Sequence, residues 1–222
     1  MGIVYRVIHD GARADRCRNV ADLYAAFGAD LAVAPAVFPL WESDRVTRAV
    51  RGCSLAHLFA LRECLAPDTD VAVFEDDVCE HAEGRRLFSL ERVPADAGIV
   101  LMGGETENVG PRDADGWREV FPKFWGTHAV LYRAALARTP FLLNAFSLLA
   151  SNPVGNAPEG FTGLCYESVL CMALQGTGLK MVRPEVMPYT TTAGWSARES
   201  GPMPARSGFL DLRAKDSGRQ AV

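Results

Sequence analysis

The sequence predicts an α/β fold, a single domain with a central, mostly parallel β-sheet flanked by helices. A strand-like stretch at 2–8, helical spacing over 14–27 and a second strand-like stretch at 29–36 follow one another. This strand–helix–strand order implies that the two strands pair in parallel. The residues Val71–Phe74 are apolar in succession, as in a strand that is covered on both faces. The chain of 222 residues is 49% hydrophobic, which is enough for one substantial core.

The composition argues against several classes of function. A net charge of −4 and a sequence pI of about 5.6 give no general attraction to nucleic acid or to an anionic membrane. No apolar run approaches the roughly 20 residues of a transmembrane helix, and the first residues lack the layout of a signal peptide. We therefore expect a cytoplasmic protein. The six cysteines form no Cys-x-x-Cys pair, which argues for reduced thiols and against a zinc site.

The predicted helix at 14–27 begins near three arginines and ends at a glycine. Its apolar residues recur on one face, and Gly28 is expected to cap its C-terminus. Arg13, Arg16 and Arg18 lie near its start, where positive charge opposes the helix dipole. Their placement therefore does not serve helix stability. They either meet a phosphate group or form a solvated face.

Three consecutive acids end the buried strand that we predict over 70–78, and a predicted helix over 51–65 precedes it. In an open α/β sheet, ligands bind at the C-terminal ends of the strands. Glu75, Asp76 and Asp77 repel one another and need a cation, unless they form a solvated turn; Mg²⁺ and Mn²⁺ suit carboxylates. If the strand continues, Glu75 and Asp77 share one face and Asp76 points the other way. If the chain has already turned, Asp76 also approaches the metal.

The second half of the chain alternates apolar stretches with polar, glycine-containing segments. Pro140 lies inside one predicted helix and should kink or split it. In chain order we expect a charged cover at 79–94, strand 98–103, an irregular loop 105–116, extended chain 117–125, strand 129–132, helix 134–149, loop 151–162, helix 163–176 and strand 179–182. We assign residues 1–200 to the domain and 201–222 to a tail without periodicity, which we expect to be loosely packed or disordered.

Three blocks of sequence occur in a fixed order between positions 50 and 145. They are Gly-Cys-x-Leu-x-His at 52–57, Glu-Asp-Asp-Val at 75–78, and Gly-Thr-His-Ala-Val-Leu-Tyr at 126–132 followed by Ala134-Ala135. In combination they resemble glycosyltransferase family 25, which includes bacterial lipooligosaccharide galactosyltransferases and collagen galactosyltransferases. Ala56 replaces the serine that usually precedes the helix histidine, and the first strand lacks the family's Asn-Leu pair. These departures concern the acceptor more than the donor chemistry.

The resemblance implies a GT-A-like fold and metal-dependent, inverting transfer of a sugar from a nucleotide sugar, a UDP-sugar, to an acceptor hydroxyl. The acceptor would be a glycan, a hydroxylated protein side chain or a hydroxymethylated DNA base. A nucleotide-sugar-binding protein without turnover is the main alternative. A metal-dependent phosphohydrolase or nucleotidyltransferase would need a second acid cluster or a nucleophile motif, and the sequence shows neither. It also lacks Gly-x-Gly-x-x-Gly and P-loop motifs, which argues against dehydrogenases and kinases.

The expected metal site consists of the acids at the strand end. We place Asp77 first as a ligand of Mn²⁺ or Mg²⁺, followed by Glu75 or Asp76, because the last acid projects furthest from the sheet. Asp76 would otherwise contact the ribose of the donor. Arg16 and Arg51 are candidates to neutralise its phosphates, and Gly103, at a strand end, allows a ligand or backbone to approach closely.

An inverting transfer also needs a general base from the C-terminal half of the chain. Glu167, at the start of a predicted helix, is our first candidate; the alternative is a carboxylate that stabilises the helix dipole. Glu105 and Glu107 are weaker candidates. His57 is expected to support the acidic strand from its helix, and His128 to be a polar core residue with one hydrogen bond.

Overall fold

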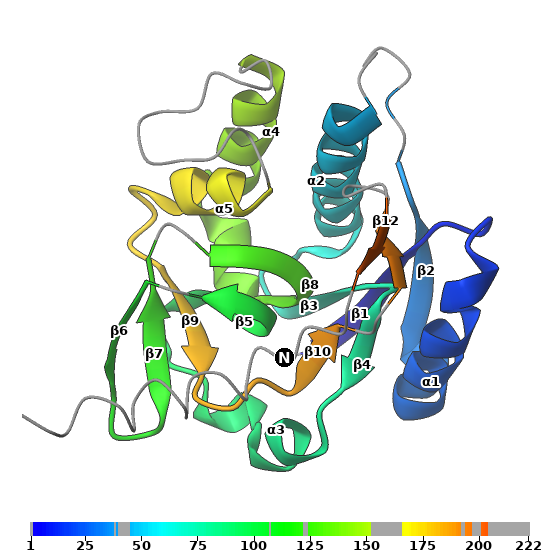
Figure 1. Cartoon of the computed structure of the whole chain (residues 1–222). Helices are drawn as coiled ribbons and strands as arrows, with labels where there is room; N and C mark the ends of the chain where they lie inside the picture. The colour runs from blue at the N-terminus through cyan, green and yellow to red at the C-terminus, as the bar shows by residue number, and fades with distance from the viewer. Residues whose placement is uncertain are drawn as a thin grey trace, which may run out of the picture.

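The computed structural model describes residues 2–37, 39, 45–106, 108–121, 124–151, 166–191, 194–196 and 201–203. These residues form one large mixed sheet with helices on both faces, as Figure 1 shows. The predicted α/β architecture, with a central, mostly parallel sheet flanked by helices, is therefore confirmed. In the described part of the chain, no helix is both long enough and apolar enough to cross a membrane.

The central sheet has eight strands in the order β2-β1-β3-β8-β5-β9-β7-β6. Only β7 and β8 run against the direction of the other strands, because each pairs antiparallel with its neighbours. The strands are β1 (Gly2–His9), β2 (Leu31–Pro35), β3 (Thr69–Glu75), β5 (Ala97–Thr106), β6 (Val109–Arg112), β7 (Trp117–Val120), β8 (Phe124–Tyr132) and β9 (Lys180–Pro184). Two small ribbons accompany the sheet, formed by β4 (Val78–Glu80) with β10 (Tyr189–Thr191) and by β11 (Gly194–Ser196) with β12 (Gly201–Met203).

Helices cover both faces of the sheet (Figure 1), and the described part of the chain contains five α-helices. They are α1 (Cys17–Phe27), α2 (Arg45–Cys64), α3 (Ala82–Leu87), α4 (Phe141–Ser151) and α5 (Tyr166–Leu174). Alternate residues of β3 divide between two apolar clusters: Val71 and Val73 pack with residues of α2, α4 and α5, whereas Ala72 and Phe74 pack with residues of α1. A strand whose two faces are both buried needs an unbroken apolar run, as this sequence has.

The first three strands create a point where the strand order reverses. The chain leaves β1, forms α1 on one face and adds β2 on one side of β1. It then returns through α2 on the opposite face and adds β3 on the other side of β1. The C-terminal ends of β1 and β3 therefore lie side by side at a topological switch point, which is where open α/β sheets bind ligands.

Most predicted elements are present, but several boundaries differ. Helix α2 begins at Arg45, six residues before the predicted start at 51. The segment 105–116, predicted to be an irregular loop, instead contains the end of β5 and the edge strand β6. An edge strand needs no alternating apolar pattern, and its unpaired side tolerates Pro111. Strand β3 ends at Glu75, and Val78–Glu80 leaves the sheet to pair with β10.

The remaining predictions fall partly outside the described residues. As predicted, Pro140 splits the helix at 134–149, here into a 3-10 helix, Ala134–Arg138, and α4. Of the predicted loop at 151–162, only the first residue is among the described residues. The predicted helix at 163–176 is described from its fourth residue onward. Of the predicted tail, Gly201–Met203 forms β12, and 204–222 lie outside the description. The division into a domain and a tail stays a prediction.

Candidate functional site

The three acids divide at the end of β3. Glu75 is the last residue of the strand, and Asp76 and Asp77 form the turn that follows it. Asp76 faces β1, whereas Glu75 and Asp77 both face His128 on β8. The chain has thus turned at Asp76, yet the alternation expected from a continuing strand is kept. Asp76 does not join the other two acids.

Glu75, Asp77 and His128 form a compact cluster at this edge of the sheet. One ligand atom from each residue lies within 4.8 Å of the other two. His128 Nδ1 is 3.3 Å from Asp77 Oδ1 and 3.7 Å from Glu75 Oε2. The prediction that His128 is a core residue with a single hydrogen bond is wrong. The β3–β8 pairing ends at Phe74 opposite Ala129, so the next pair of positions brings Glu75 and His128 together.

Electrostatic interactions make the members of this cluster charged. Burial alone would raise the pKa of Asp77, but His128 and Arg16 hold that pKa well below its usual value. Burial alone would lower the pKa of His128, but the charge and hydrogen bond of Asp77, with Glu75, raise it to about 9. Burial alone would raise the pKa of Glu75, but its contact with His57 and the charge of His128 lower it. The imidazolium therefore serves as the cation that the acids require.

Asp76 is held by groups at the end of β1 and just after it. His9 Nδ1 lies 2.9 Å from Asp76 Oδ2, and the Asp10 N–H donates to the same oxygen at 3.3 Å. Arg16 Nη1 lies 2.8 Å from Asp76 Oδ1 and 3.0 Å from Asp77 Oδ2. Asn19 donates to the Asp76 carbonyl oxygen at 3.0 Å. Arg16 thus contacts carboxylates in this structure, and Asp76 connects the end of β3 to β1.

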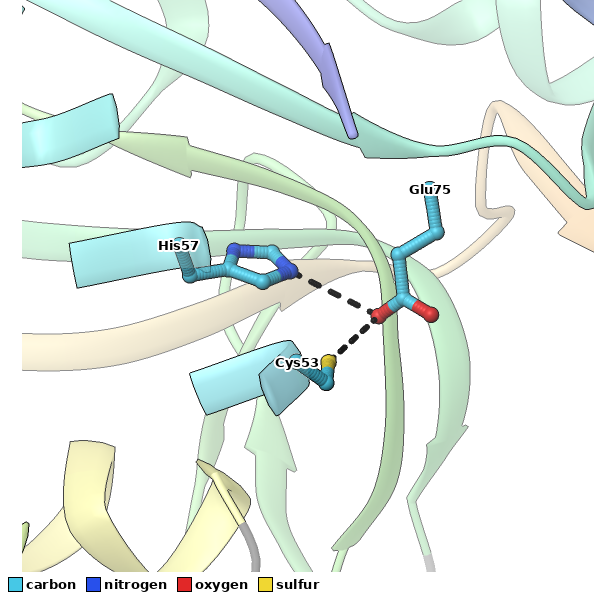
Figure 2. Close-up of side chains that lie close together, drawn as sticks. All are labelled: Cys53, His57 and Glu75. Atoms are coloured by element: carbon cyan, nitrogen blue, oxygen red, sulfur yellow. Dashed lines mark hydrogen bonds and ion pairs between the residues drawn. The ribbon is translucent and has the colours of Figure 1, made fainter. Parts of the chain in front are cut away.

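Three further side chains contact the Oε1 atom of Glu75. Thr127 Oγ1 donates to Glu75 Oε1 at 2.9 Å, and Cys53 Sγ lies 3.6 Å from the same oxygen. His57 is fully buried, and its Nε2 lies 3.5 Å from Glu75 Oε1, as Figure 2 shows. The prediction that His57 supports the acidic strand from its helix is confirmed. Sequence analysis missed Thr127 and Cys53 as contacts of Glu75, although both lie within the motifs that it identified.

Glu167, the predicted base, lies on α5 beside the cluster. Its side chain is almost buried, and Oε1 accepts a hydrogen bond from the Gly126 N–H at 2.7 Å. Its charge contributes to the raised pKa of His128. Gly126 has a φ of +82°, and a Cβ there would lie 2.5 Å from His128 Nε2. Glu167 therefore holds the glycine that gives His128 its space, and its role as a base stays a prediction.

The structure places the other predicted site residues as follows. A Cβ on Gly103 would lie 3.3 Å from the Tyr189 carbonyl oxygen, so this glycine allows the close approach of β10. Arg51 lies in α2 two residues before Cys53, with its Nε buried. Glu105 belongs to β5 rather than to a loop, and Glu107 lies outside the described residues. Contacts of Gly103 and Arg51 with a donor stay predictions.

The cluster of Glu75, Asp77 and His128 fits a divalent cation. Its two carboxylates and one imidazole suit Mn²⁺ better than Mg²⁺, which takes oxygen ligands almost exclusively. The His128 Nδ1 atom is buried and faces both carboxylates, so it can act as a ligand once it is deprotonated. These three residues would hold the ion, and the imidazole would give up its proton to do so.

Comparison with known proteins gives no family assignment. No family model and no curated protein matches this chain. One similar solved structure is a glycosyltransferase involved in the glycosylation of the major capsid of PBCV-1, with 13% identity, a TM-score of 0.43 and coverage of 71% of each chain. Another is a mutant of Drosophila β1,4-galactosyltransferase 7 in complex with manganese, UDP-Gal and xylobiose, with 12% identity, a TM-score of 0.44 and coverage of 100% of this chain and 81% of that one. At these values neither alignment carries an argument about this chain.

Proposed function

We propose that this protein is a metal-dependent glycosyltransferase that moves a sugar from a nucleotide sugar to an acceptor hydroxyl. The observation that carries the proposal is the position of Glu75, Asp77 and His128, which meet at the C-terminal end of β3, beside the switch point of the sheet. Two of the three blocks that resemble glycosyltransferase family 25 supply these residues, and the third supplies Cys53 and His57 beside them. Residues distant in the sequence therefore converge where a ligand is expected.

The site supplies the charge that transfer from a nucleotide diphosphate requires. A Mn²⁺ or Mg²⁺ ion bound there would offset the negative charge that builds up on the diphosphate leaving group. Asp77 and Glu75 would hold it together with His128. Arg16 and Asp76 would keep Asp77 in place and position the end of β1 beside the donor. We take the nucleotide of the donor to be UDP. Arg51 and Gly103 remain further proposed donor contacts.

We propose Glu167 as the general base of an inverting reaction. Deprotonation of the acceptor hydroxyl requires a carboxylate on the C-terminal side of the site, and Glu167 is the acid that α5 brings next to His128. A Glu167→Gln variant keeps an oxygen that accepts the Gly126 N–H but cannot take up a proton. With Glu167 as the base, we expect this variant to bind the donor normally and to lose turnover. Normal turnover of the Glu167→Gln variant would show that Glu167 only holds Gly126 in place.

Calorimetry with a panel of nucleotide sugars tests the function. We expect one UDP-sugar to bind in the presence of Mn²⁺ and to bind far more weakly after chelation. Failure of every nucleotide sugar to bind in a metal-dependent way would contradict the proposal. With the donor known, release of UDP in the presence of glycan, hydroxylysine-containing peptide or hydroxymethylated DNA identifies the acceptor. Donor binding without transfer or hydrolysis would instead support the non-catalytic alternative.

A further inference from the structure

A second group of ligand atoms lies at the Oε1 atom of Glu75, whereas His128 faces its Oε2 atom. Cys53 and His57 are four residues apart on α2, so their side chains project from one face of that helix toward the end of β3 (Figure 2). Cys53 Sγ, His57 Nε2 and one carboxylate oxygen of Glu75 lie within 4.8 Å of one another. A thiol, an imidazole and a carboxylate are the three side-chain types that bind Zn²⁺.

The two distances from Glu75 to its partners in this group match edges of a zinc tetrahedron. With usual zinc bond lengths, a tetrahedral site separates a nitrogen and an oxygen ligand by about 3.4 Å and a sulfur and an oxygen ligand by about 3.6 Å. Here His57 Nε2 lies 3.5 Å and Cys53 Sγ 3.6 Å from Glu75 Oε1. The third pair, Cys53 Sγ and His57 Nε2, lies within 4.8 Å, so a common ion is within reach of all three side chains.

A buried hydrogen-bond chain directs the free nitrogen of His57 into this group. Tyr132 OH donates to Tyr166 OH at 2.8 Å and lies 3.2 Å from His57 Nδ1. Because the Tyr132 proton is engaged by Tyr166, the Tyr132 oxygen can accept a hydrogen bond from His57 Nδ1, and this tautomer leaves Nε2 without a proton. The opposite nitrogen, Nε2, is then the one left to bind a metal. It is buried and makes no hydrogen bond to the described residues.

The two oxygens of Glu75 face different groups. Oε1 faces Cys53 and His57, whereas Oε2 faces His128. We propose that Cys53, His57 and Glu75 form a second metal site, selective for Zn²⁺ or a similar thiophilic ion, which shares Glu75 with the cluster of Asp77 and His128. Binding would replace the Cys53 thiol proton, which passes to solvent, and would leave one coordination position for water.

The absence of a Cys-x-x-Cys pair argued against zinc at the level of sequence, but this site uses another pattern. Two ligands come from one helix face at positions i and i+4, and the third comes from the next strand. Bound zinc would tie α2 to the end of β3 and fix Glu75. The site needs no nucleotide sugar, so it is independent of the proposed transferase function.

Cobalt(II) is the probe, because Co²⁺ replaces Zn²⁺ and reports a thiolate ligand through a charge-transfer band in the near ultraviolet. The chelator-treated full chain is titrated with Co²⁺ and then with Zn²⁺. We expect the thiolate band to appear and to be abolished by Zn²⁺, and Zn²⁺ to raise the melting temperature. Absence of a thiolate band in the wild type would overturn the proposal.

Three variants locate the site. Cys53→Ser should lose the band, whereas Cys79→Ser, which removes another half-buried thiol, should keep it. Asp77→Asn should also keep the band while it loses the first cluster, which separates this proposal from the transferase proposal. A band that persists in Cys53→Ser would contradict the assignment. Because serine preserves the size of the side chain, circular dichroism should show an intact fold.

Discussion

Asp77 and His128 hold opposite charges 3.3 Å apart at the end of the central sheet. The pKa of Asp77 is lowered and that of His128 is raised to about 9, so both are charged at neutral pH. Asp77 lies in the turn after β3 and His128 on β8, and these two strands are distant in sequence and adjacent in space. In the metal-free protein the imidazolium satisfies the acids that would otherwise repel one another. A metal ion at this site must displace that proton.

Gly52 should not tolerate a methyl group although it lies inside a helix. Alanine in a helix interior is usually more stable than glycine by about 1 kcal/mol. Here a Cβ would lie 1.9 Å from the Val37 carbonyl oxygen, which is backbone and cannot rotate away. We expect Gly52→Ala to lower the free energy of unfolding by about 3 kcal/mol or more, measured with urea. Gly11→Ala, with no atom within 4 Å of its Cβ, is the control, and equal stability of the two variants would refute the packing.

The Tyr132 hydroxyl should contribute to stability through its two buried partners. Tyr132 is fully buried, and its removal leaves Tyr166 OH and His57 Nδ1 without this contact. We expect Tyr132→Phe to lower the free energy of unfolding by about 1–3 kcal/mol. Tyr24→Phe, at a side chain that is 40% exposed, should change it by less than about 0.5 kcal/mol. A neutral Tyr132→Phe would mean that the hydrogen-bond chain does not hold His57.

Thr127 should orient Glu75 through one hydrogen bond to its Oε1 atom. Thr127→Val keeps the shape of the side chain and removes the donor, whereas Thr127→Ser keeps the donor. We expect Thr127→Val to weaken Mn²⁺ binding by about 10- to 100-fold, as loss of outer-shell partners does in other metal sites. Thr127→Ser should restore binding to near the wild-type value. Equal Mn²⁺ affinity of both variants would show that Thr127 does not position Glu75.

Arg118 and Glu185 should give the edge of the sheet a pH-dependent contact. The hydrogen bond from Arg118, 2.7 Å long, holds the pKa of Glu185 below its usual value. A lowered pKa stabilises the folded state above the unfolded pKa of about 4.3, and this stabilisation is lost as pH falls through the folded pKa. Because the Glu185 side chain is 41% exposed, we expect Glu185→Gln to cost less than about 1 kcal/mol at pH 7.

The comparison across pH is the check on this contact. Protonated Glu185 resembles glutamine, so urea unfolding of Glu185→Gln and wild type should converge as the pH falls below 4. A difference in the free energy of unfolding that stays constant or grows as the pH falls would contradict this prediction.

Local pattern predicted the elements that are covered on both faces and the position of the acids. The unbroken apolar run before Glu75 predicted a buried strand that ends in carboxylates, and Gly28 ended its helix as expected, with a φ of +63°. The role of His57 also followed from its helix beside that strand. These inferences need only the spacing of residues close in sequence.

Contacts that depend on strand pairing could not be predicted in this way. His128 reaches Glu75 only because β8 inserts antiparallel between β3 and β5, which local periodicity does not specify. The strand β6 was missed because an edge strand lacks an apolar pattern. Gly103 accommodates the backbone of β10, a contact that the sequence could not distinguish from a bound ligand.

Binding of Mn²⁺ to the metal-free protein tests the central claim most directly. Free Mn²⁺ gives a strong electron paramagnetic resonance signal that falls when the ion is bound, so the signal measures affinity without any substrate. We expect the wild type to bind Mn²⁺ and Asp77→Asn to bind it at least about tenfold more weakly, because one of two carboxylate ligands is lost. Asp96→Asn, which removes an exposed acid paired with Lys180, should bind as the wild type does. Equal affinity of Asp77→Asn and Asp96→Asn, or no binding by the wild type, would contradict a metal site at Glu75, Asp77 and His128.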